Sequence, residues 1–227
     1  MEKNKKKRVK IKIIPILITL LILIIILFCF HLLAQIPIKN IYIKGNNYIT
    51  DQEIIEQAKI SDYPSFIKTT ASSIKKKLSK NPYIKKVVVK KKWFSEIYIE
   101  IEEENLLFRK DENDLVVLEN KEELDDNNKY NLPILLNYIP DTKYDSFIKG
   151  MNKVSESVKS QISEIRYYPN TQDDDRFLLY MNDGNYVYLT LTKFKQINYY
   201  EDVLVNLEGK KGILYLDSGN HFKIMEE

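Results

Sequence analysis

Residues that could do chemistry are sparse in this chain. It has two histidines, His31 and His221, and a single cysteine, Cys29. Nucleophilic hydrolysis needs a serine or cysteine beside an orienting base, and the sequence has no Gly-x-Ser-x-Gly motif to present one. Its six glycines form no Gly-rich phosphate loop. The sequence therefore offers no candidate catalytic residue and no candidate cofactor-binding residue.

One acidic cluster, Asp173 to Asp175, contains the oxygen ligands that calcium prefers. It lacks the spaced ligands and the central glycine of a calcium loop, so we interpret it as a solvated hairpin tip and expect no metal site. A pair of carboxylates for glycoside hydrolysis needs only proximity in space. The sequence points to no particular pair, so that reaction stays open at this stage.

Two runs of lysine have two interpretations each. Lys75 to Lys77 would form a solvated helix face, and Lys90 to Lys92 a charged strand end that discourages pairing at a sheet edge. Alternatively, these runs contact anionic lipid or a wall polymer beside a membrane.

A long uncharged stretch, residues 13–34, determines where the rest of the chain works. It exceeds the roughly 20 residues needed to cross a bilayer core. Seven basic residues lie in the twelve positions before it. The positive-inside rule therefore predicts a cytoplasmic tail, residues 1–12, and a single-pass protein whose bulk is extracytoplasmic. A cleavable signal peptide is the alternative, although its apolar core is usually only about 7–15 residues long.

Composition limits the exported part. The chain's only cysteine, Cys29, lies inside the apolar stretch, so no disulfide can form within the exported part. Residues 35–104 carry a net charge of +4 and residues 105–227 a net charge of −7. This change of sign supports two domains. Neither domain is basic enough to suggest nucleic acid as a partner.

The first exported segment predicts a β-α-α-β-β order. Thr50 and Glu53 form a capping box that begins the first helix. Ile97, Ile99 and Ile101 alternate with polar residues, as in a half-buried strand. The expected elements are a strand at 38–43, a helix from Thr50 to Lys59, a helix at 69–79, and strands at 84–90 and 97–102. Three strands with two helices on one face make an α+β layer domain.

The second segment is rich in predicted strands. Asp183-Gly184 is a strong hairpin signal between two of them. Helices are expected at 143–161 and 192–207, because apolar residues recur there at helical spacing. Strands are expected at 106–108, 115–118, 162–168, 177–182, 186–191 and 213–216, the last followed by a turn at 217–219 and a short tail. Residues 132–136 form a short apolar run.

These residues together resemble one family. The motifs are the strand-to-helix pattern at 41–54, the run Asn81-Pro82-Tyr83-Ile84 continuing to Val89, Lys92-Trp93 before the strand at 97–104, and the segments 132–135 and 213–219. A membrane anchor followed by this order resembles the FtsQ/DivIB bacterial cell-division proteins, which have a POTRA domain and a β domain. The resemblance implies a transmembrane helix at 13–34, a POTRA domain at 36–104 and a β domain at 105–227.

The resemblance also implies a function. Such proteins are non-enzymatic scaffolds of the division septum that use no cofactor. They recruit membrane division proteins of the FtsB/DivIC and FtsL types, are linked indirectly to septal peptidoglycan synthase, and contact membrane lipid through the anchor. Addition of a partner strand to an exposed last strand would then involve a short run of residues, Tyr215, Leu216, Asp217, Ser218 and Gly219. The alternative functions are a membrane-anchored exported cell-wall enzyme and a protein-translocation module.

Overall fold

The computed structural model describes residues 13–92, 95–125, 130–205, 207 and 209–225. The expected cytoplasmic tail, residues 1–12, lies outside the described residues. Contacts divide the chain into two units, Met1–Glu103 and Glu104–Glu227. Each unit has its own hydrophobic core and is described by itself.

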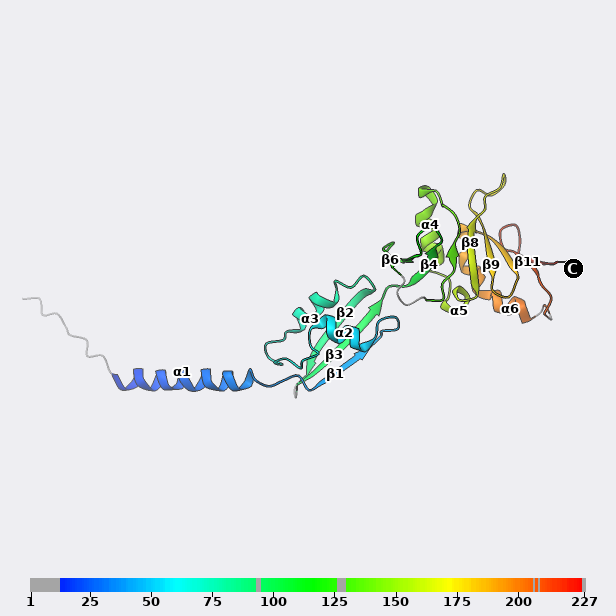
Figure 1. The fold of residues 1–227 in the computed structure, drawn as a ribbon. Helices are drawn as coiled ribbons and strands as arrows, with labels where there is room; N and C mark the ends of the chain where they lie inside the picture. Colours follow the sequence, from blue (N-terminus) through cyan, green and yellow to red (C-terminus); the bar gives the residue numbers. More distant parts are fainter. Residues whose placement is uncertain (1–12, 93–94, 126–129, 206, 208, 226–227) are drawn as a thin grey trace, which may run out of the picture. The chain divides into compact units, whose positions relative to one another are not determined.

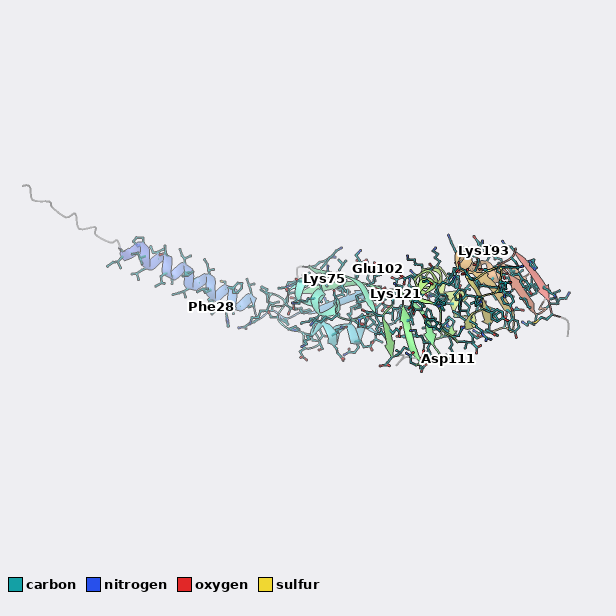
Figure 2. All side chains as sticks on the ribbon, turned by 90° about the horizontal axis from the view of Figure 1, so that it is seen from above. Phe28, Lys75, Glu102, Asp111, Lys121 and Lys193 are labelled. Carbon is teal, nitrogen blue, oxygen red and sulfur yellow. The ribbon has the colours of Figure 1, made fainter. Side chains whose placement is uncertain are left out.

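The first helix, α1 (Ile13–Leu33), has no buried residue. Its apolar side chains, Phe28 among them, project all around the helix (Figure 2). Thr19 satisfies its hydroxyl by donating to the Ile16 carbonyl at 2.8 Å. Within the described residues, α1 is the one helix long and apolar enough to cross a membrane.

The rest of the first unit has the expected β-α-α-β-β order (Figure 1). Strand β3 lies in the centre of the sheet, parallel to β1 and antiparallel to β2. The bounds are β1 (Asn40–Lys44), α2 (Asp51–Ala58), α3 (Ala71–Leu78), β2 (Ile84–Lys92) and β3 (Glu96–Glu103). The α+β class is therefore confirmed for this unit.

Local signals position the helices of this unit. The capping box of α2 is present, because Thr50 accepts from the Glu53 N–H while Glu53 accepts from the Thr50 N–H. Helix α2 ends at Lys59, whose left-handed conformation (φ 56°) stops it. The inner face of α2 and the inner face of β3 share one core, built from Ile54, Ala58, Ile97, Ile99 and Ile101.

The second unit is built on one mixed sheet of nine strands. The strand order is β12-β11-β10-β9-β8-β7-β4-β5-β6, with parallel pairs β10–β11, β7–β8 and β4–β7. The bounds are β4 (Leu106–Lys110), β5 (Leu115–Leu118), β6 (Glu123–Asp125), β7 (Ile134–Leu135), β8 (Ile162–Tyr167), β9 (Arg176–Met181), β10 (Tyr186–Thr190), β11 (Gly212–Tyr215) and β12 (His221–Ile224). Two of these strands, β6 and β12, are absent from the sequence-based expectation, and β7 lies in the stretch expected only as a short apolar run.

Helices cover one face of this sheet. The expected stripe Phe147, Ile148, Met151, Val154 and Val158 is buried in the core. The core also takes alternate residues of the strands, such as Phe177 and Leu179 of β9 and Val187 and Leu189 of β10. Their neighbours in sequence therefore lie on the opposite face, which carries no helix in the described chain.

The two expected helices of this unit are each divided in two. The segment 143–161 forms α4 (Asp141–Met151) and α5 (Glu156–Lys159), and the segment 192–207 forms the 3₁₀ helix η1 (Leu191–Tyr199) and α6 (Tyr200–Val205). Asn198 of η1 accepts from the Ser155 N–H and donates to the Lys153 carbonyl, both at 2.8 Å. These bonds satisfy the backbone between α4 and α5, so a continuous helix is not required there.

Candidate partner-binding surface

The strand expected to be the last one is not at the edge of the sheet. Strand β11 pairs with β10 on one side and with β12 on the other. The expectation that Tyr215 to Gly219 border an exposed last strand is therefore wrong. These residues instead form the end of β11 and the turn that leads into β12, near the C-terminal end in Figure 1.

Tyr215 lies on the face of the sheet that carries no helix. Its ring stacks on Tyr188 of β10 with centroids 5.5 Å apart, and on His221 of β12 at 4.8 Å with an angle of only 8° between the planes. The register explains both contacts, because Tyr188, Tyr215 and His221 are directly opposite one another across three strands. A half-buried aromatic row therefore runs to the edge strand.

Asp217 anchors the turn after β11. Its Oδ2 accepts from Arg176 Nε at 2.7 Å, and only 8% of its side chain is exposed. The guanidinium of Arg176 also lies 3.6 Å from the Tyr188 ring centroid. Burial raises the pKa of Asp217, but hydrogen bonds from Arg176 and Ser218, with the charge of Arg176, outweigh it and lower this pKa.

The other expected residues have different surroundings. Leu216 is buried in the core, and its N–H donates to the Tyr188 carbonyl at 2.7 Å. Ser218 is exposed, and Gly219 has a φ of 145°, in the region that favours glycine. The structure thus brings Tyr215 and Asp217 to one surface and turns Leu216 away from it.

The free edge belongs to β12. Within the described chain, no strand pairs with its outer side. The Met225 N–H donates to the Lys211 carbonyl at 3.0 Å, and bonded pairs alternate along an antiparallel ladder. His221 and Lys223 therefore bond to β11, which leaves the N–H and C=O groups of Phe222 and Ile224 directed outward.

A hollow of about 430 Å³ lies beside this edge. Tyr199 and Val203 of the helical layer line one side of it, and Leu214, Leu216 and Phe222 line the other. Tyr199 is 64% exposed at its rim. An apolar side chain carried by an added strand could enter this hollow.

The β12 strand could have been predicted from the sequence, but the ion pair of Asp217 could not. His221-Phe222-Lys223-Ile224 alternates polar and apolar residues after a Ser-Gly turn, which is a strand signal. No local signal identifies Arg176 as the partner of Asp217, because the two residues are 41 positions apart.

The acidic cluster at 173–175 and His221 have structural partners. Asp174 and Asp175 both pair with Lys143, which raises the pKa of that lysine, and Asp173 accepts from the Asp175 N–H. His221 is exposed and stacked on Tyr215. In the part of the chain that the structure describes, no group of three His, Cys, Asp or Glu residues could hold a metal ion.

Two models of known protein families match this chain. Residues 36–104 match the model of the FtsQ-type POTRA domain. Residues 107–218 match the model of the C-terminal region of cell division protein FtsQ/DivIB. The chain belongs to the FtsQ/DivIB family. The resemblance drawn from the motifs is thereby confirmed, and a role in bacterial cell division follows from membership.

Individual relatives agree with this assignment. The cell division protein DivIB of Bacillus cytotoxicus is 32% identical over 197 residues, which cover 84% of this chain and 77% of that protein. DivIB of Bacillus subtilis is 31% identical over 197 residues, 82% of this chain and 73% of that protein. A solved extracytoplasmic domain of DivIB from Geobacillus stearothermophilus is 22% identical and covers 47% of this chain and 96% of that one. Its TM-score is 0.39.

Proposed function

We propose that this FtsQ/DivIB protein is a non-enzymatic scaffold of the division septum. Helix α1 anchors it with the N-terminus in the cytoplasm and the POTRA and β domains outside. It recruits small bitopic division proteins of the FtsB/DivIC and FtsL types and links them to septal peptidoglycan synthesis. The free edge of β12 is the observation on which this proposal rests.

The chemistry of that edge suits strand addition. The outward N–H and C=O groups of Phe222 and Ile224 offer main-chain bonds to a partner strand. The neighbouring hollow offers a place for one of its side chains. Tyr215 and His221, on the face without helices, would contact the side chains that point the other way.

The opposite edge of the sheet is less suited to pairing. Strand β6 has three residues, two of them acidic. Short, charged edge strands discourage pairing with another chain. We therefore assign recruitment of the partner to the edge of β12 and not to an exposed strand at 213–216. Tyr215 and Asp217 contribute indirectly, because they stabilise the β11–β12 hairpin.

Substitution Ile224→Pro tests this assignment. It removes one outward N–H, and no N–H that bonds to β11 is lost. We expect full-length protein in detergent to bind the small bitopic partners of its own organism about tenfold more weakly, a loss of ~1.4 kcal/mol. Ile224→Thr keeps the N–H and should bind as well as the natural protein.

Hydrogen exchange of β11 checks that both variants keep their hairpin. Equal binding by the proline and threonine variants would move the interface away from β12. If no bitopic division protein binds the natural chain, the scaffold function fails, and wall hydrolysis by the purified chain should then be measured, as the cell-wall enzyme alternative requires.

A further inference from the structure

One face of the POTRA sheet has no helical cover. Helices α2 and α3 lie over the face that carries Ile97, Ile99 and Ile101 (Figure 1). Strand residues alternate between faces, so Tyr98 and Glu100 lie on the other face, beside Tyr42 of β1. The face that carries Tyr42, Tyr98 and Glu100 is called the open face below.

An aromatic pair lies at the centre of the open face. The rings of Tyr42 and Tyr98 stack with centroids 4.7 Å apart, and Tyr42 is 47% exposed. The ammonium group of Lys92 lies 4.1 Å from the centroid of the Tyr98 ring. A hollow of about 420 Å³, bordered by these residues and Lys90, opens beside the pair. Tyrosine and lysine are thus combined on one accessible surface.

The register places this pair two residues along β1 and β3 from the end of the sheet that follows α1 in the chain. Strands β1 and β3 are parallel, with Asn40 opposite Glu96, and the Lys39 N–H donates to the Ser95 carbonyl at 2.9 Å. Only residues 34–39 separate the last residue of α1 from β1. Six residues span at most about 20 Å, so this end of the sheet cannot move far from the membrane that holds α1.

Charge is graded along the open face. Lys90 is opposite Tyr98 and Lys92 is opposite Glu96, at the end near α1. Glu100 and Glu102 lie further along β3, and Glu100 is already paired with Lys44 at 3.0 Å. At the end near α1, Lys90 and Lys92 are accompanied by one carboxylate, Glu96. Further along the face, Lys44 lies opposite Glu100 and Lys86 lies opposite Glu102. The open face therefore carries an excess of positive charge at the end near α1 and balanced charge beyond it.

We propose that the Tyr42, Lys90, Lys92 and Tyr98 surface binds anionic phospholipid headgroups of the membrane that α1 spans. Lysine ammonium groups are attracted to anionic headgroups over about a Debye length. Tyrosine rings prefer the membrane–water interface. The short connection favours lipid over a wall polymer, because lipid is always within reach. This inference rests on the proposed anchoring by α1 and not on the scaffold function.

Trp93, the chain's only tryptophan, follows Lys92 in the sequence and serves as the fluorescent probe. Full-length protein would be placed in nanodiscs that contain brominated phosphatidylcholine, with or without phosphatidylglycerol. We expect quenching of Trp93 fluorescence to be about twofold stronger with the anionic lipid. This increase should disappear at about 0.5 M NaCl, where the Debye length is ~4 Å.

Two charge-reversal variants separate the surface from net charge. The double variant K90E/K92E should lose the effect of anionic lipid. The matched variant K75E/K76E changes the same net charge on exposed residues of α3 (Lys75 is labelled in Figure 2) and should keep it. Equal quenching in both lipid compositions, or an equal loss in both variants, overturns the proposal.

Two further outcomes are distinguishable. If soluble poly(glycerol phosphate) changes Trp93 fluorescence while anionic lipid does not, a wall polymer replaces lipid as the ligand and the proposal fails. A chain that does not co-elute with nanodiscs would show that α1 does not anchor it, which overturns the lipid contact together with the anchoring. Neither outcome bears on recruitment through β12.

Discussion

At the scale of single residues, Asp217 connects the turn after β11 to the neighbouring strands. Its carboxylate joins the end of β11 to Arg176 of β9, and the same arginine lies against Tyr188 of β10. One ion pair therefore ties three neighbouring strands together next to the proposed binding edge. Removing one member of a largely buried pair leaves the other charge without compensation, which is costly.

The substitution Asp217→Asn should destabilise the β11–β12 hairpin by about 2 kcal/mol at neutral pH. Because the folded-state pKa of Asp217 is lowered, its stabilising effect is present above the unfolded value of about 4 and is lost as the pH falls through the folded value. The difference between the natural chain and the variant should therefore shrink below about pH 4. Hydrogen exchange of β11 at several pH values measures it.

The control for this prediction is Asp145→Asn. Asp145 pairs with Lys121 on the surface, and its side chain is 60% exposed. Exposed ion pairs contribute little, so exchange in β11 should not change. If both variants behave alike, the Arg176–Asp217 pair does not hold the hairpin.

At the scale of elements, contacts between helices decide where a helix ends. The apolar stripe from Phe147 to Val158 continues without interruption, and it predicts one helix. The break between α4 and α5 depends on Asn198, which lies more than forty residues further along the chain and bonds to Lys153 and Ser155. Ser155 then accepts from the Val158 N–H and caps α5.

The substitution Asn198→Ala should remove both bonds to this turn. We expect the local free energy of opening at residues 152–156 to fall by about 1–2 kcal/mol, seen as faster hydrogen exchange there. Lys195→Ala, at an exposed position of η1, is the matched control and should leave the exchange unchanged. Unchanged exchange in the Asn198 variant would mean that packing alone sets the break.

At the scale of the whole molecule, charge is divided among three segments. The first twelve residues contain seven basic side chains, residues 35–104 have a net charge of +4, and residues 105–227 one of −7. The positive-inside rule predicts that the basic tail keeps the N-terminus in the cytoplasm. In the proposed orientation, both folded units then lie outside.

Cysteine labelling tests this orientation. With Cys29 replaced by serine, Ser72→Cys on the exposed surface of α3 should react with an impermeant maleimide in intact cells. Asn4→Cys should react only after the membrane is permeabilised. The reverse pattern would contradict the proposed orientation and, with it, an extracytoplasmic scaffold.

Much of the architecture follows from local sequence. The apolar stretch of α1, the capping box of α2 and the Asp183-Gly184 turn each depend on residues within a few positions of one another. Such signals act before any tertiary contact forms, so they could be read in order along the chain. The β-α-α-β-β order and the family motifs were predictable for the same reason.

The edge of the second sheet was decided only in three dimensions. Alternation marks His221 to Ile224 as a strand, but it does not say which neighbour that strand takes or which of its sides stays free. That outcome depends on partners far away in sequence, such as Asp217 with Arg176 and β11 with β10. The sequence alone thus determined the apolar helix, the β-α-α-β-β order of the first unit and the family. Only the tertiary structure decided which edge is free, because non-local pairing leaves no local pattern.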